Sequence, residues 1–172
     1  YWKDMAVAHL LSDLSQSIFA TLGVAGATNS LAIADNPGQR ECVLLIDGMG
    51  SNAVELCSSR LPIFSQLENH CALQATFPST TSTSLTSFGT GAAVGVHGMV
   101  GYTMRVPHSG DPERLLNALK WDERVDPFIW QSEKTLFERA RLQGIKVSHV
   151  AAKRYQETGF TRAALRGADY LG

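Results

Sequence analysis

The spacing of apolar residues at the start of the chain is that of an α-helix. Over residues 5–22 they recur every three or four positions, which places them on one helix face. Gly23 follows directly, and glycine is a common residue just past the end of a helix. The pattern therefore predicts a helix over residues 5–22. A loop is expected over residues 26–40, where Gly, Asn, Pro and Asp are frequent.

Residues 42–46 form a continuous apolar run with β-branched members, which predicts a strand buried on both faces. The run ends in Asp47-Gly48, and helical patterns follow over residues 51–58 and 61–67. A strand that leads into a helix is typical of βα units, whose loops at the strand ends hold ligands. Asp-Gly is also a common hairpin turn, and this alternative stays open.

The remaining pattern alternates between short strands and helices. It predicts an α/β fold in a single domain, with a mostly parallel sheet and helices on both of its faces. The expected elements are a strand over 73–77, a helix after the hydroxyl-rich turn, a structured loop with a short strand over 94–102, a weak helix over 111–120, aromatic packing over 122–130, a helix from Ser132 to Gly144, a strand over 145–151, a helix over 161–165 and a strand over 168–171.

Residues 77–91, FPSTTSTSLTSFGTG, place a run of hydroxyls before a short apolar segment. Small polar residues in this position favour a helix N-terminus, where the first N–H groups have no partner inside the helix. Such an end attracts anions, and a hydroxyl held there beside a metal can attack phosphorus. The alternative is a Ser/Thr-rich surface loop.

Composition narrows the function classes. The 172 residues are 44% hydrophobic and 18% charged with a formal net charge of -1, which is globular and favours neither a nucleic acid polymer nor an anionic membrane. No apolar run approaches the length of a membrane span. The three cysteines lack zinc-type spacing, and reduced thiols favour a cytoplasmic protein. Because the chain begins without Met, a secreted or cell-surface location stays open.

Three histidines are weighed as metal ligands against structural roles. His97, just before Gly98, is expected to form a structural hydrogen bond in preference to binding a metal. His9 is expected to be a packed or surface residue, and His149, inside a predicted strand, a core residue with its hydrogen bonds satisfied.

Three motifs in order resemble the alkaline phosphatase superfamily, and most closely its type I phosphodiesterase/nucleotide pyrophosphatase family. The first is a hydrophobic strand that ends in Asp, VLLIDGMG, and the second is a Thr at a helix start, FPSTTSTS. The third combines Thr90-Gly91, His97-Gly98 and Gly101-Tyr102. The resemblance covers most of residues 10–172.

The resemblance implies roles for five residues. Asp47 would be a carboxylate ligand of one metal in a two-metal site, with zinc as the expected ion. Thr81 would bind the same metal and act as the nucleophile; Thr80 is the alternative, because the hydroxyl run allows a slip of one residue. Backbone N–H groups near Thr81 and Ser82 would bind a phosphate oxygen. Ser84 stands where nucleotide pyrophosphatases have an Asn that contacts the phosphoryl group, which is a departure from the family pattern.

The implied function is metal-dependent hydrolysis of phosphate esters, with a small-molecule phosphate ester or nucleotide as substrate. Two metals need about six protein donors. The residues after Thr81 lack the family's paired Asp and His arrangement. We therefore expect residues 1–172 to be the N-terminal part of one alkaline-phosphatase-like catalytic domain whose C-terminal part is absent. Such a fragment should bind zinc weakly and turn over little substrate alone.

Other functions are weighed against this one. Another hydrolase of the superfamily, such as a phosphomonoesterase or phosphonate hydrolase, stays open, whereas a sulfatase is disfavoured because its Cys/Ser-x-Pro/Ala-x-Arg motif does not occur. A non-catalytic α/β binding module would dock a partner through residues 121–130. A doubly wound nucleotide-binding fold is disfavoured because neither GxGxxG nor GxxxxGK occurs.

Overall fold

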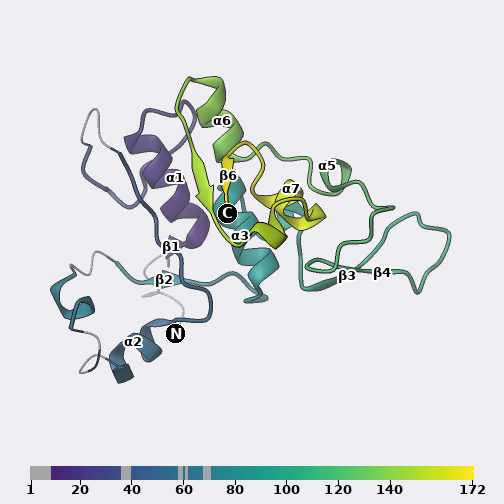
Figure 1. The fold of residues 1–172 in the computed structure, drawn as a ribbon, viewed down its shortest axis with the longest axis horizontal. Coiled ribbons are helices and arrows are strands. Elements are labelled where there is room, and N and C mark those ends of the chain that lie inside the picture. Colours follow the sequence, from purple (N-terminus) through teal and green to yellow (C-terminus); the bar gives the residue numbers. More distant parts are fainter. Residues whose placement is uncertain (1–8, 36–39, 58–59, 61, 68–70) are drawn as a thin grey trace, which may run out of the picture. The chain divides into compact units, whose positions relative to one another are not determined.

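The computed structural model describes residues 9–35, 40–57, 60, 62–67 and 71–172 (Figure 1). These residues form two compact units, one within Tyr1–Gln39 and Leu73–Gly172 and the other within Arg40–Ala72. The elements of the first unit are β1 (His9–Leu10), α1 (Leu11–Thr21), β2 (Leu73–Gln74), α3 (Thr81–Thr90), α4 (Val94–His97), β3 (Thr103–Arg105), β4 (Leu115–Asn117), α5 (Pro127–Trp130), α6 (Leu136–Leu142), β5 (Ser148–Val150), the 3-10 helix η3 (Lys153–Tyr155), α7 (Gly159–Ala164) and β6 (Asp169–Leu171).

The strands of the described residues pair two at a time. β1 pairs with β2 and β5 with β6, both in parallel, whereas β3 and β4 form an antiparallel pair. The mixed α/β character is therefore confirmed. The predicted single, mostly parallel sheet with helices on both faces is not formed by the described residues, because each pair stays separate from the others.

Helix α3 is the centre of the first unit, with α1, α6 and α7 packed around it (Figure 1). Phe137 of α6 joins the helices through aromatic contacts, because its ring centroid lies 5.7 Å from that of Phe19 on α1 and 6.4 Å from that of Phe88 on α3. Leu136 and Leu116 are fully buried in the same core.

The helix predicted over residues 5–22 is confirmed by α1 within the described residues. Gly23 follows shortly after the end of α1, with a φ of +83°. Its buried residues differ from the predicted apolar stripe, because Ser12, Ser15 and Ser17 are buried beside Phe19. Two of these hydroxyls have backbone partners: Ser15 Oγ donates to the Ser12 carbonyl at 3.0 Å, and Ser17 Oγ accepts the Leu31 N–H at 3.1 Å. Small hydroxyl side chains let α1 lie close to α3, whose buried residues are also mostly Ser and Thr.

In the second unit, the prediction of a buried strand over residues 42–46 is wrong. These residues have no regular structure, and Leu44 is 81% exposed. A strand needs a neighbour for its N–H and C=O groups, and no described strand pairs with this run. Asp47 and Gly48 form a turn, and α2 (Ser51–Cys57) follows, so the alternative of a hairpin is wrong as well.

Two further predicted elements differ in length or type. The helix expected over 61–67 is reduced to the 3-10 helix η2 (Phe64–Gln66), with residue 61 outside the described residues. The weak helix predicted over 111–120 is wrong, because β4 lies there. Met104 of β3 stands opposite Leu116 of β4, and both side chains are buried, so packing across the hairpin outweighs the weak helical pattern.

The later predictions are confirmed in part. The predicted loop over 94–102 contains helix α4 in place of a short strand, and α6 begins at Leu136 in place of Ser132. Helix α6 ends before Gly144, which has a φ of +78°, and β5 and β6 lie inside the two predicted strands. The predicted aromatic packing is present between Trp121 and Trp130, whose ring centroids are 6.4 Å apart. Within the described residues, no helix is long and apolar enough to cross a membrane.

Candidate active site

The hydroxyl-rich turn ends in a capped helix. Thr80 is the N-cap of α3, with an extended backbone, and its Oγ1 accepts the Thr83 N–H at 3.3 Å. In return, Thr83 Oγ1 accepts the Thr80 N–H at 3.2 Å. This reciprocal capping box satisfies two N–H groups that the helix itself leaves unpaired. The predicted helix N-terminus is therefore confirmed, and the run is not merely a surface loop.

A second set of hydroxyl contacts ties the preceding turn to α3. Thr76 lies just before the bend at residues 77–78, and its Oγ1 donates to Thr83 Oγ1 at 3.1 Å and lies 3.3 Å from Ser84 Oγ. Thr83 Oγ1 is also 2.6 Å from the Pro78 carbonyl. These contacts give the start of α3 a fixed geometry.

The predicted site residues occupy different environments within this turn. Thr81 is the first residue of α3 and is half-buried. Ser82 is fully buried, and its Oγ donates to the Gly101 carbonyl at 2.9 Å. Ser84 is half-buried with its hydroxyl against Thr76. A phosphate contact at position 82 would thus come from the backbone N–H, because the side chain is engaged inside the protein.

His97 has the structural role that the sequence predicts. It is 2% exposed, and its Nδ1 accepts the Met99 N–H at 3.1 Å. The neutral ring must then carry its proton on Nε2, which donates to Ser87 Oγ at 2.9 Å. Burial lowers the pKa of His97 to about 4. The pair connects α3 to α4, and His97 cannot act as a base toward Ser87 in this tautomer.

His149 differs in part from its prediction. Its ring packs at 5.0 Å, edge to face, against Tyr170 of the neighbouring strand β6. The side chain is half-buried, and its Nδ1 is buried without a hydrogen-bond partner among the described residues. Burial lowers the pKa of His149.

Asp47 lies in the other unit, in an exposed turn that follows the run 42–46. Thr81 belongs to the first unit, and the metal predicted to join Asp47 and Thr81 stays a prediction. Within the described ranges, no group of three His, Cys, Asp or Glu side chains could hold a metal ion. The three cysteines, at positions 42, 57 and 71, are free thiols.

Comparison with known families decides the affiliation. The family model described as type I phosphodiesterase / nucleotide pyrophosphatase matches residues 42–164, which is more than half of the chain. The chain belongs to this family. Membership in the type I phosphodiesterase/nucleotide pyrophosphatase family indicates a hydrolase of that type and implies small-molecule phosphate ester substrates. No curated protein and no solved structure shows detectable similarity to the chain.

The sequence analysis did not identify Thr76 and Thr83, which shape the turn, or Ser87, which bonds to His97 from within α3. The spacing from Thr80 to Thr83 could have revealed the capping box, although a Thr replaces the usual Glu or Gln at the third helical position. No local pattern predicts the contact between Ser87 and His97 or the one between Ser82 and Gly101, because both join different segments of the chain.

Proposed function

We propose that the chain carries the nucleophile of a metal-dependent phosphodiesterase or nucleotide pyrophosphatase, and that this nucleophile is the Thr81 hydroxyl. The observation that supports Thr81 over Thr80 is the assignment of the helix cap. The Thr80 hydroxyl accepts the Thr83 N–H and lies 2.9 Å from the Thr83 hydroxyl, so it is engaged in holding the turn. Thr81 follows it as the first residue of the helix.

The helix start supplies chemistry suited to a phosphoryl group. The positive end of the α3 dipole and its first N–H groups favour negative charge on the phosphoryl oxygens. Thr81 Oγ1 would form a bond to phosphorus while the bond to the leaving oxygen breaks. The Thr81 proton passes to solvent, and the leaving group departs with the bonding electron pair. Water then cleaves the phosphothreonine and restores the hydroxyl.

The expected cofactor is a pair of divalent ions, with zinc as the expected metal and Asp47 and Thr81 as ligands of one ion. A catalytic zinc takes three protein ligands. The described residues group no three suitable side chains together, so by themselves they do not fit a two-zinc site. Asp47 and Thr81 remain our proposed contribution to it.

Replacing Thr81 tests the proposed nucleophile. We expect Thr81→Ala to lower the turnover of bis(p-nitrophenyl) phosphate by about 100-fold or more, because no hydroxyl remains to form the covalent intermediate. Thr81→Ser should retain part of the activity. Because turnover by the chain alone is expected to be small, mass spectrometry should also be used to find a p-nitrophenyl phosphoryl group on the peptide that contains Thr81.

Thr80→Ala is the matched control. It removes the helix cap and should lower the free energy of unfolding by about 1 kcal/mol while leaving the phosphorylated residue unchanged. Equal turnover by wild type and Thr81→Ala, an adduct on Thr80, or no adduct on any residue would each contradict the assignment.

A further inference from the structure

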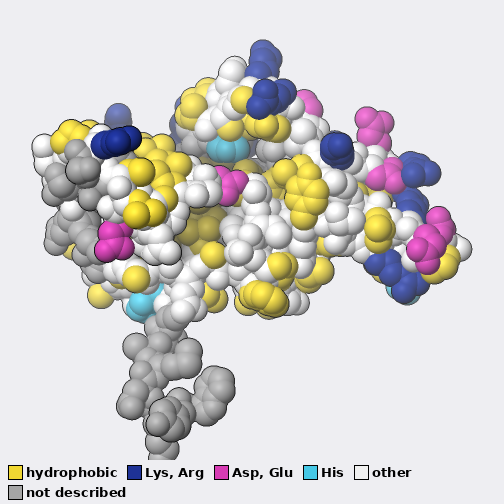
Figure 2. Space-filling view, turned by 90° about the horizontal axis from the view of Figure 1, so that it is seen from below, with side chains coloured by type: hydrophobic (Ala, Val, Ile, Leu, Met, Phe, Trp, Pro, Cys, Tyr) yellow, Lys and Arg dark blue, Asp and Glu magenta, His cyan; other side chains and the backbone are white. Residues whose placement is uncertain are grey.

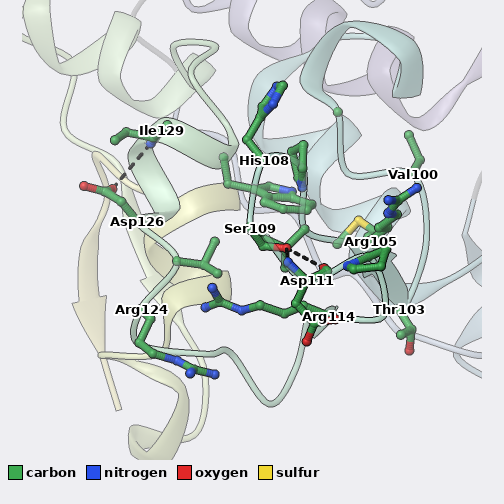
Figure 3. Close-up of a pocket in the computed structure, with 18 residues that line it drawn as sticks. Val100, Thr103, Arg105, His108, Ser109, Asp111, Arg114, Arg124, Asp126 and Ile129 are labelled. Atoms are coloured by element: carbon green, nitrogen blue, oxygen red, sulfur yellow. Dashed lines mark hydrogen bonds between the residues drawn. The ribbon is translucent and has the colours of Figure 1, made fainter.

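A cleft of about 1260 Å³ lies between the β3–β4 hairpin and residues 124–130, in the same unit as the candidate active site (Figure 3). Arginines from three separate segments line it: Arg105 on β3, Arg114 just before β4, and Arg124 in the loop before α5. We call it the arginine cleft. Basic and acidic side chains gather together at this end of the unit (Figure 2).

A single carboxylate orients two of the arginines. Asp122 Oδ2 lies 2.8 Å from Nη2 of both Arg114 and Arg124, and Asp122 Oδ1 accepts Arg124 Nε at 2.9 Å. Hydrogen bonds from Arg124, and then from Arg114, hold the pKa of Asp122 well below its usual range. One negative charge therefore faces two positive charges. Arg105, exposed on β3, adds another and has no ion-pair partner among the described residues.

The two acidic residues that line the cleft accept hydrogen bonds from the backbone of their own segments. Asp126 Oδ1 accepts the N–H groups of Phe128 and Ile129 at 2.8 and 3.4 Å and so caps α5 (Figure 3). Asp111 Oδ1 accepts the Glu113 N–H at 2.9 Å. Both carboxylates are thus held within local turns, whereas the guanidinium groups of the lining arginines carry several more donors than their observed partners use.

Two buried donors at the cleft have no acceptor among the described residues: Arg114 Nε and Trp130 Nε1. The neighbouring indole is different, because Trp121 Nε1 donates to the Val125 carbonyl at 2.7 Å. A buried donor without a partner destabilises a protein. Because both atoms are buried, acceptor oxygens of a ligand in the cleft would satisfy them only once the two side chains turn toward it.

Part of the wall is apolar, although Thr103, His108 and Ser109 also line the cleft. Val100, Val106, Ile129 and Trp130 line the cleft, and Ile129 is 81% exposed. A fully hydrated inorganic anion would gain nothing from these side chains. A ligand with an oxygen-rich anionic end and an apolar or aromatic body would use both kinds of surface.

We propose that the arginine cleft binds an organic phosphate monoester, with its phosphate oxygens on the lining arginines and its apolar body against Ile129 and Trp130. Guanidinium groups match phosphate oxygens in geometry and charge, and such charge-assisted hydrogen bonds are the strong ones. The site goes beyond the proposed function, because it uses neither Thr81 nor Asp47.

The indole N–H signals of the ¹⁵N-labelled chain test this directly, with phenyl phosphate as the probe. We expect the Trp130 indole signal to shift progressively with phenyl phosphate, because Trp130 lines the cleft and the phenyl ring would pack against it. The Trp121 signal should move less, since its N–H is already bonded to Val125. Trp130→Phe and Trp121→Phe assign the two signals. Inorganic phosphate should bind about tenfold more weakly or worse, because it makes no apolar contact.

Matched variants separate the cleft from other anion sites. Arg114→Gln should weaken binding by about tenfold, and Arg105→Gln by severalfold. Arg105 forms none of the ion pairs with Asp122, so its variant keeps the test valid if Arg114→Gln does not fold. Arg141→Gln, an exposed arginine on α6 away from the cleft, should bind like wild type.

Three results would overturn the proposal. The first is a Trp130 signal that does not move, and the second is equal affinity of Arg105→Gln and wild type. The third is loss of binding in Thr81→Ala, which would place the phosphate at the start of α3 instead. Equal affinity for phenyl phosphate and inorganic phosphate would contradict the role given to the apolar wall. None of these readouts depends on turnover, so they stand apart from the test of the nucleophile.

Discussion

At the scale of single residues, His97 shows how burial and hydrogen bonding fix a protonation state. The folded protein holds its pKa at about 4, whereas an unfolded chain has a His pKa of about 6.5. The folded state therefore favours the neutral ring, because burial disfavours the charged imidazolium; a proton on Nδ1 would also remove the acceptor for the Met99 N–H. This contribution to stability is complete above pH 6.5. It decreases as the pH falls toward 4, and little further is lost below that value.

The expected slope is at most about 1.4 kcal/mol per pH unit in this window. Urea unfolding at several pH values between 7 and 4 should show it in the wild type, and His97→Gln, which does not titrate, should have a flatter dependence. His108→Asn is the control, because His108 lies in an exposed turn with a φ of +56° that Asn tolerates. Parallel pH profiles for wild type and His97→Gln would show that His97 does not contribute to the pH dependence.

At the scale of elements, the crossing of α3 and α7 depends on Gly89. A Cβ at this position would overlap the backbone carbonyl of Ala164 and also approach Leu165 Cδ2 at 3.1 Å. Because a backbone carbonyl cannot move aside as a flexible side chain can, we expect Gly89→Ala to lower the free energy of unfolding by about 1–3 kcal/mol. Thermal unfolding measures the effect.

Gly95→Ala is the matched control for this prediction, because Gly95 lies in α4 with nothing near the position of an added Cβ. Alanine favours a helix over glycine, so this variant should be unchanged or slightly more stable. If both substitutions had the same effect, close packing at Gly89 would not be the cause.

Elements could be predicted from the sequence where local residues define them. Thr135 begins α6 with a capping box and Gly144 follows its end, so this helix follows from its own residues. Strands depend on partners that the local sequence does not name. The apolar run 42–46 is therefore exposed without a paired strand among the described residues, and residues 115–117 become a strand because they pair with β3.

The features of the candidate site likewise divide into those that the local sequence predicts and those that depend on distant parts of the chain. The helix start at Thr80 and Thr81 was predictable, because capping depends on neighbours within three residues. The structural role of His97 was predictable, but its partner Ser87 was not. The arginine cleft could not be predicted, because it depends on the pairing of β3 with β4 and on the position of residues 124–130 beside them.

At the scale of the whole molecule, the proposed function and the positions of the possible metal-binding side chains lead to different expectations for metal binding. The proposed function includes a two-metal site, but the described residues bring no three donor side chains together. A tight protein zinc site needs at least three such donors.

We therefore expect the chain to bind zinc with a dissociation constant of about 10 µM or weaker in isothermal titration calorimetry. Added zinc should raise the unfolding temperature by no more than about 2 °C at a concentration near that constant, because binding at this level adds little to stability. Asp47→Asn should weaken the residual binding if this carboxylate is one of the ligands, whereas Asp111→Asn, a surface carboxylate that accepts a backbone N–H, is the control. Submicromolar affinity that survives Asp47→Asn would mean that other residues hold the metal, and Asp47 would then lose its proposed role.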